Sequence, residues 1–393
     1  MRIVTTGLER WLGGDDPLGR GARIGLLAHA ASIDADAVHA TRRILDAGRH
    51  RLDRVFAPEH GLWGVEQDME GVRSDVDPAT GVPVVSLYGD DAESLRPGVE
   101  HLDGLDAIVC DVQDVGSRYY TFVYTVAHIM EAAGRAGIPV VVLDRPNPIG
   151  GSIEGPVLDP ELSSFVGRYP VPVRHGMTVG EIARLARGAF GVRAELHVVP
   201  MEGWRPDMHF GDTGLPWVPP SPNMPTPGTA LVYPGGCLIE GTNLSEGRGT
   251  TSPFELVGAP WLDAERLAAS VRRAAGPAAR VRAARFRPMF GKHAGRACGG
   301  VQVIPADRDA FRPFATYMTL VAEARRQDPE SFDWRREPYE FERDRLAIDL
   351  LLGRRDLKPL LEADDVAENW DDLWRDELRD FRELRREYSL YGN

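Results

Sequence analysis

A carboxylate and an imidazole directly follow the apolar run at residues 52–57, where Pro58 leads into Glu59 and His60. An apolar run of this length predicts a buried strand. A glutamic acid at the end of such a strand, half shielded from water, could have the raised pKa that a general acid needs. The alternative is a carboxylate that caps a helix N-terminus, with His60 packed beneath it. These residues alone favour neither interpretation.

A second polar group follows a later apolar run and contains Asp111, Asp114, Arg118, Tyr119 and Tyr120. Two carboxylates beside an arginine suit the binding of sugar hydroxyls or the placement of a catalytic carboxylate. Equally, one aspartate pairs with Arg118 and only fixes the loop. The two tyrosines suit stacking on a sugar face, with one of them expected in the core.

The third polar group lies between glycines at residues 240–251 and contains Glu240, Asn243, Glu246 and Arg248. Glycines let the backbone approach a ligand closely, so the segment predicts a site for a polyhydroxylated ligand. A network of structural turns is the less favoured interpretation. The segment is not a P-loop, because it lacks the Gly-Lys-Ser/Thr ending.

Several other activities are disfavoured by missing motifs. Residues 28–32 follow the first predicted strand and lack the Gly-x-Gly-x-x-Gly pattern of dinucleotide binding. A Gly-x-Ser-x-Gly nucleophile elbow and paired metal-binding histidines are also missing from the sequence. His175 and His293 are isolated, and such histidines are more often structural than ligands. The sequence therefore predicts neither a cofactor nor a metal.

The elements that would position these groups alternate between strands and helices. Thr178 and Glu181 form a capping box at the start of one helix. Continuous apolar strands separated by helices predict a parallel α/β sheet, whose ligands bind outside the carboxyl ends of the strands. The predicted strands are residues 23–28, 52–57, 83–87, 107–112, 139–143 and 195–200, and the predicted helices include 3–12 and 124–136.

A proline-rich segment at residues 214–227 excludes helix and central strand and predicts the crossing between two domains. We therefore divide the chain into a Rossmann-like domain, residues 1–227, and a smaller α/β or α+β domain, residues 228–393. The second domain is predicted to contain strands at 230–233, 281–288 and 300–305, helices at 263–275 and 309–327, and amphipathic helix after residue 346.

The composition of the chain excludes several classes of binding partner. The chain of 393 residues has a net charge of −13, which argues against nucleic acid, since phosphate binding needs a basic face. No apolar segment is long enough to span a membrane. The N-terminus has no signal-peptide pattern, so a cytoplasmic location is expected. The three cysteines are too few and too scattered for a disulfide framework or a zinc site.

Taken in order, several segments resemble the bacterial NamZ-type exo-β-N-acetylmuramidases, formerly catalogued as a domain of unknown function. The family usually has a Thr-Asn pair after its first strand, where this chain has Ala28 and His29. If that asparagine contacts substrate, this chain differs there. The matching segments are residues 56–64, 111–121, 143–151, 173–178, 219–226, 240–251 and 292–295.

The resemblance implies a Rossmann-like domain, a smaller second domain and an active site in the cleft between them. It implies release of terminal β-linked N-acetylmuramic acid from the non-reducing end of peptidoglycan fragments. Glu59 is our choice for the general acid. The second group required for hydrolysis is Asp114, Glu246, Tyr120 or the acetamido group of the substrate.

The lactyl carboxylate of muramic acid suits a guanidinium fork, supplied by Arg118, Arg174 or Arg248. Asn147 and Asn243 would orient hydroxyl or acetamido groups. The remaining substrate-binding candidates are His60, Asp111, Tyr119, Tyr120, His175, Asn223 and Glu240.

Two other functions stay open on sequence grounds. The chain could be a muropeptide- or sugar-binding protein that retained the cleft without turnover, or an esterase or amidase acting on the same fragments. The intact Glu59 and the intact 240–251 segment argue against simple binding. The sequence does not determine the oligomeric state.

Overall fold

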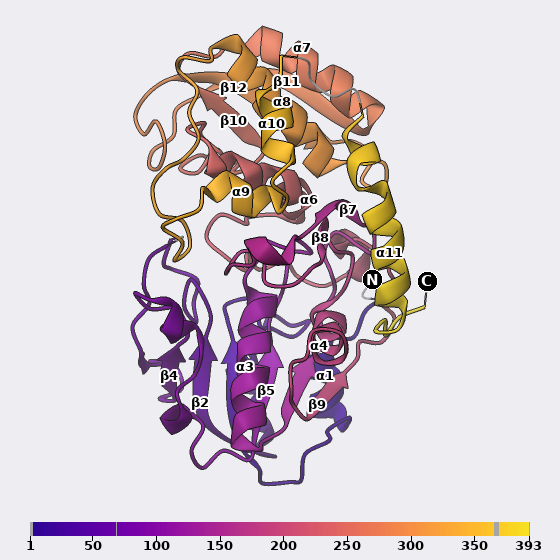
Figure 1. Cartoon of the computed structure of the whole chain (residues 1–393). Coiled ribbons are helices and arrows are strands. Elements are labelled where there is room, and N and C mark those ends of the chain that lie inside the picture. The colour runs from indigo at the N-terminus through magenta and orange to yellow at the C-terminus, as the bar shows by residue number, and fades with distance from the viewer. Residues whose placement is uncertain (1–2, 68, 365–368, 393) are drawn as a thin grey trace.

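The computed structural model describes residues 3–67, 69–364 and 369–392, and within them seven strands form the main sheet of the larger half (Figure 1). The sheet order is β3-β4-β2-β1-β5-β6-β9, parallel except for the short strand β3. This confirms the predicted parallel α/β sheet. The strands are β1 (Arg23–Ala28), β2 (Arg51–Ala57), β3 (Asp75–Val76), β4 (Pro83–Ser86), β5 (Ala107–Asp111), β6 (Val140–Leu143) and β9 (Leu196–Val199).

Helices cover both faces of this sheet. Along β1, Leu26 packs in one apolar cluster with helices α1 (Gly7–Gly13) and α2 (Ala40–Ala47). Leu27 packs in another with α3 (Phe122–Ala136) and α4 (Val179–Gly188). Successive strand residues point to opposite faces, so a strand buried on both sides is apolar throughout. The parallel strands also bring Glu59, Tyr88 and Asp114 to one edge, because each follows the carboxyl end of a strand.

The capping box predicted at Thr178 and Glu181 is confirmed. Thr178 caps α4, and Glu181 completes the capping box by accepting from the Thr178 N–H. The helix predicted at 3–12 is shorter, because Thr6 is the N-cap of α1 and forms a second capping box with Glu9.

The smaller half contains an antiparallel sheet of order β10-β12-β11, packed against helices. Gly353 adopts a left-handed conformation that ends α9, so the predicted helical tail is broken into pieces. The short helix α5 (Phe210–Thr213) still belongs to the larger half. The elements of the smaller half are α6 (Pro227–Gly236), β10 (Leu256–Ala259), α7 (Ala264–Ala275), β11 (Ala279–Phe286), β12 (Cys298–Pro305), α8 (Pro313–Gln327), α9 (Ala347–Leu352), α10 (Leu357–Glu362) and α11 (Arg375–Arg386).

The strand predicted at residues 230–233 is wrong, because this segment lies inside α6. Thr226 caps the helix and Pro227 occupies its first turn, where proline is tolerated. The apolar residues are buried on every side of α6, so they lack the periodicity of a surface helix. A short, fully buried helix and a buried strand give the same apolar run.

The two halves share one core. A continuous apolar cluster runs from α3 through Tyr119 and Tyr233 to α8. A hairpin of β7 (Glu154–Val157) and β8 (Pro172–Arg174) contacts α11, and this C-terminal helix runs down the side of the molecule toward the larger half (Figure 1). The domain boundary after residue 227 stays a prediction. No helix in the described part of the chain is long and apolar enough to cross a membrane.

The end of the chain is fastened to a buried carboxylate. Tyr391 donates a hydrogen bond to Asp144 at 2.6 Å, and Thr178 and the Gly180 N–H donate to the same side chain. The N–H of Leu390 donates to Glu181. These contacts explain how the C-terminal segment, distant in sequence, closes over β6 and α4.

Asp144 predicts a pH dependence of stability. Burial raises the pKa of Asp144 to about 7, against the lowering effect of its hydrogen bonds. The unfolded chain ionises this group near its ordinary pKa of about 4. The native state therefore holds the extra proton between these values, and its stabilising contribution is lost as the pH rises through about 7. We expect the free energy of unfolding of the wild type, minus that of Asp144→Asn, to fall between pH 4.5 and 7.5.

Urea unfolding at a series of pH values measures this difference. Asp46→Asn is the control, because Asp46 is exposed and pairs only across the helix surface with Arg42. A difference for Asp144→Asn that stays flat across this range would contradict the prediction.

Candidate active site

A cavity of about 40 Å³ lies between the two halves, at the carboxyl edge of the parallel sheet. Its position agrees with the rule for open α/β sheets. It receives side chains from the loops after β2 and β5 and from the smaller half. The lining residues are Glu59, His60, Tyr119, Tyr120, Thr121, Phe122, Val166, Ser221, Asn223, Met224, Tyr233, Glu240, Arg248, Phe254, Tyr339 and Glu340.

Glu59 is fixed in the cavity by two neighbours. The Thr121 hydroxyl donates a hydrogen bond to Glu59 Oε2 at 2.7 Å, and His60 Nε2 lies 3.9 Å from Glu59 Oε1. His60 has a positive φ of 69°, which turns the chain sharply after the glutamate, and its Nδ1 hydrogen-bonds the Glu66 carbonyl at 3.0 Å. The chain then continues through turns toward β3. Glu59 begins no helix itself, but the Thr121 that donates to it is the N-cap of α3, so Glu59 lies at a helix N-terminus as the alternative interpretation expected.

Tyr119 and Tyr120 both line the cavity and both are buried. The Tyr119 hydroxyl donates to the Leu351 carbonyl at 2.7 Å, which ties the loop after β5 to the smaller half. Tyr120 packs edge-on against Phe122 and Tyr233. Burial raises the pKa of Tyr120 well above its usual value, so its phenol stays neutral. The sequence predicted that one of the two tyrosines belongs to the core, and in the structure both are buried.

The 240–251 segment brings a charged network to the other wall of the cavity. Arg248 donates to Glu240 Oε1 at 2.7 Å, and Tyr339 donates to Glu240 Oε2 at 2.6 Å. Glu246 lies behind this wall, with Lys292 at 2.9 Å and Arg248 Nε at 3.4 Å. Burial acts to raise the pKa of Glu246, but the charges of Lys292 and Arg248 outweigh it and hold this pKa below its usual range. Glu246 is therefore an ionised partner of two cations.

Asp111 and Asp114 lie away from the cavity lining. Asp111 forms a buried, bidentate ion pair with Arg145, at 2.5 and 2.7 Å. The predicted partner Arg118 instead donates to backbone carbonyls, including that of Pro156 at 3.0 Å. Asp114 accepts from the Gly116 N–H at 2.6 Å. Both aspartates thus shape the loop that carries Tyr120.

Four further candidates form hydrogen bonds with main-chain groups and do not line the cavity. Arg174 donates to the Ile149 carbonyl, and Asn147 donates to the Met177 carbonyl at 3.0 Å. His175 Nδ1 accepts from the Met177 N–H at 3.2 Å, and its Nε2 lies 3.5 Å from Asp114. Asn243 donates to the Ser331 carbonyl at 2.8 Å. Asn223, by contrast, lines the cavity and donates to Gln67.

Sequence reasoning missed several polar and aromatic groups of the lining. Tyr339 and Glu340 stand in a segment without glycine whose many charged residues are typical of a solvated surface, far along the chain from Glu59. Only the packing of the two halves brings them there. The lining residues that were not predicted as site residues include Thr121, Phe122, Ser221, Tyr233, Phe254, Tyr339 and Glu340.

Comparison with known proteins identifies the family. Residues 24–228 match the family described as "Exo-beta-N-acetylmuramidase NamZ, N-terminal", and residues 231–391 match its C-terminal counterpart. This chain belongs to the NamZ exo-β-N-acetylmuramidase family. Its class is therefore that of a glycoside hydrolase.

Relatives of the NamZ family match over the whole length. The chain is 41% identical over 389 residues to "Peptidoglycan beta-N-acetylmuramidase NamZ" of Bacillus subtilis (strain 168), covering 99% of this chain and 91% of the relative. A crystal structure of a DUF1343 family protein from Bacteroides fragilis superposes with a TM-score of 0.88 at 30% identity, with complete coverage of both chains. A second one superposes with a TM-score of 0.77 at 25% identity, covering 99% of each chain.

His29, the departure from the usual NamZ sequence, is a structural residue in this chain. Burial lowers the pKa of His29 well below its usual value, so the ring is neutral. Its Nε2 accepts a hydrogen bond from the Gln113 N–H at 2.8 Å, and its ring packs edge-on against Phe122. The histidine therefore supports the loop after β5 and does not line the cavity.

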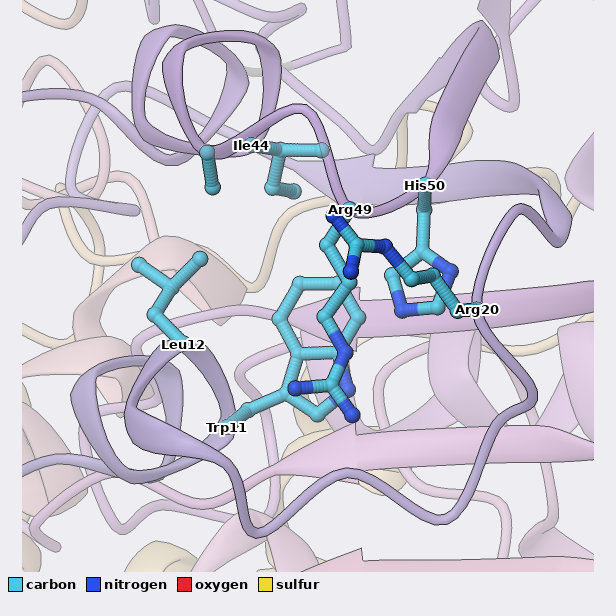
Figure 2. Close-up of a pocket in the computed structure, with 7 residues that line it drawn as sticks. Trp11, Leu12, Arg20, Ile44, Arg49 and His50 are labelled. Atoms are coloured by element: carbon cyan, nitrogen blue, oxygen red, sulfur yellow. The ribbon is translucent and has the colours of Figure 1, made fainter.

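A larger hollow, about 400 Å³, lies at the opposite edge of the sheet, where β1 and β2 begin. Figure 2 shows the side chains that line it. Asp16 accepts from His50 at 2.6 Å and from Trp11 at 2.9 Å, and Arg49 lies 2.7 Å from it. The hollow is lined by Trp11, Leu12, Arg20, Ile44, Ala47, Arg49 and His50. This lining contains no carboxylate that could protonate a leaving group, so size alone does not identify the active site of this NamZ family member.

Proposed function

We propose that this protein hydrolyses the glycosidic bond of terminal, non-reducing β-N-acetylmuramic acid in peptidoglycan fragments. The observation that carries the proposal is Glu59, held by Thr121 in a cavity between the halves of a NamZ-family chain. A buried glutamic acid at this position can protonate the oxygen of the leaving sugar. Peptidoglycan fragments are the substrate class that the family implies.

The cavity is small for this task. Ligand pockets for small molecules begin at about 300 Å³, and this cavity measures about 40 Å³. The halves share a continuous core, so we expect side chains and loops of the lining to move when a sugar ring enters.

Hydrolysis of two chromogenic substrates tests the proposal. We expect release of the aryl group from a β-N-acetylmuraminide and much slower release from the matching β-N-acetylglucosaminide, which lacks the lactyl group. Tight binding of the muraminide without cleavage would favour the sugar-binding alternative. Release of an acyl group with the sugar intact would favour an esterase or amidase.

Arg248 is our candidate for recognition of the lactyl carboxylate. It is the arginine or lysine that lines the cavity within the described residues, whereas Arg118 and Arg174 are committed to backbone carbonyls. Arg248 already lies beside Glu240 and Glu246, and its planar guanidinium, with five donors, has the geometry that suits a carboxylate.

Replacing Arg248 by lysine keeps the charge and removes the planar fork. We expect KM for the muraminide to rise by roughly 10-fold or more, the loss of one charge-assisted hydrogen bond, with little change for the glucosaminide. Steady-state kinetics on both substrates measure this. Arg287→Lys is the control, since Arg287 is an exposed arginine of the smaller half. Equal losses on the two substrates would contradict a role in lactyl recognition.

The cytoplasmic location predicted from the sequence stays a proposal, and fractionation of the source cells would check it.

A further inference from the structure

Glu340 reaches the cavity from a loop of the smaller half that an aromatic cluster holds in place. The next residue, Phe341, contacts Tyr88 and Phe165 of the larger half, with ring centroids 5.3 and 5.8 Å apart. Tyr88 and Phe165 also contact each other at 5.8 Å. Phe341 therefore anchors its loop against the larger half at the edge of the sheet where Glu59 lies.

The backbone at this point is strained. Glu340 has a φ of 46° and Phe341 a φ of 68°, so two successive residues with side chains adopt the left-handed region. Such conformations persist only where the surrounding structure enforces them, and they cluster at functional sites. Here Glu340 and Phe341 are the central pair of a tight turn closed by two backbone hydrogen bonds between Tyr339 and Glu342, and the aromatic contacts of Phe341 hold that turn against the larger half. The strained backbone turns the Glu340 side chain into the cavity instead of toward solvent.

The Glu340 carboxylate shares the cavity with Glu59 but comes from the opposite half. Its side chain is buried, and the Tyr88 hydroxyl donates to Glu340 Oε2 at 2.9 Å. Tyr88 follows β4, the neighbour of the strand that precedes Glu59. A donor from the larger half thus orients a carboxylate from the smaller half.

The other carboxylates near the cavity have different tasks. Glu240 is held by Arg248 and Tyr339, as both of its oxygens accept hydrogen bonds from them. Glu246 lies behind the wall with Lys292. Asp114 accepts from a backbone N–H of its own loop. Among the described residues, Glu340 is therefore the lining carboxylate best placed to work together with Glu59.

We propose that Glu340 is the second catalytic carboxylate, which acts at the anomeric carbon while Glu59 protonates the leaving oxygen. This role rests on the proposed hydrolase function. Glycoside hydrolysis passes through a state with positive charge at the anomeric carbon, and a carboxylate facing that carbon is the usual second group. The assignment replaces the candidates Asp114 and Glu246.

Kinetics of two variants on aryl muraminides test the role. Glu340→Gln keeps an oxygen that accepts from Tyr88, so its fold should be preserved. We expect its kcat to fall by ~10²-fold or more on both a 4-nitrophenyl and a 2,4-dinitrophenyl muraminide. Glu59→Gln should recover much of its rate on the dinitrophenyl substrate, because a better leaving group does not need a proton. Glu342→Gln, two residues along the same loop, is the control.

Azide provides a readout that a merely structural residue would not change. In Glu340→Ala, azide can enter the vacated space and bond through nitrogen to the anomeric carbon as the aryl oxide leaves. We expect azide to raise the rate of this variant at least ~10-fold and to give muramyl azide. Azide should not raise the rate of the wild type.

The outcomes separate the two proposals. An inactive wild type would contradict the hydrolase function and the Glu340 role together. An active wild type with Glu340→Gln within ~10-fold of its kcat would overturn the Glu340 role alone. So would a folded, inactive Glu340→Ala variant that azide fails to rescue, with circular dichroism and melting temperature as the measures of folding.

Discussion

Replacing Glu59 by glutamine should lower kcat on a 4-nitrophenyl β-N-acetylmuraminide by ~10²-fold or more. Glutamine has nearly the same shape and can still accept the hydrogen bond from Thr121, so the cavity should keep its form. It carries no acidic proton, and the leaving oxygen must then depart as an anion. KM should change little, because the substitution leaves the other residues that line the cavity unchanged.

The pH dependence of the same reaction separates an acid from a structural residue. A general acid gives the wild-type rate an alkaline limb, where the acid loses its proton, and Glu59→Gln should lack that limb. Glu93→Gln is the matched control, since Glu93 is an exposed carboxylate of the larger half. A Glu59→Gln variant with near-normal kcat would remove Glu59 from the mechanism.

The parallel sheet was predictable because its strands are buried on both faces. Each such strand appears in the sequence as an unbroken apolar run, and the polar residue that ends the run also marks the edge where ligands bind. This reasoning singled out Glu59, which lies in the lining of the cavity. The same signal failed at residues 230–233, where a buried helix gives an apolar run without helical periodicity.

The ion-pair partner of Asp111 is a second feature that the sequence did not predict. Arg118 is nearer in sequence, yet the ion pair forms with Arg145, because β5 and β6 are adjacent parallel strands. Residues just after adjacent strand ends lie side by side, whereas Arg118 has already turned into the next loop. Knowledge of the strand order, which the sequence does not state, was needed to choose between them.

Residues from the smaller half were the hardest to predict. Glu340 reaches the cavity through the contacts of Phe341 with Tyr88 and Phe165, which are separated from it by long stretches of chain. Its backbone conformation is one that glycine adopts readily, and the sequence has glutamate there. The backbone preference of glutamate therefore disagrees with the conformation that Glu340 adopts. Such disagreement is expected at strained positions that serve a function, and function is the role that we propose for Glu340.

The buried pair of Asp111 and Arg145 gives the largest expected effect on stability. Both side chains are buried, two hydrogen bonds join them, and Arg145 also donates to the Ile33 carbonyl at 2.8 Å. Replacing Arg145 by methionine removes the positive charge and leaves a buried carboxylate uncompensated. We expect the free energy of unfolding to fall by about 3–5 kcal/mol, measured by urea denaturation.

Two further variants decide whether the loss of the positive charge causes the expected decrease in the free energy of unfolding. Arg42→Met removes an exposed ion pair with Asp46 and should cost about 0.5 kcal/mol or less. The double variant Asp111→Leu with Arg145→Met replaces both charges by apolar groups and should recover much of the loss, because the penalty comes from the unpaired charge rather than from the missing attraction. A double variant as unstable as Arg145→Met alone would show instead that the guanidinium matters for its packing and for its bond to Ile33. In either case the loop after β5 carries Tyr120 and Thr121, so kcat should fall together with stability.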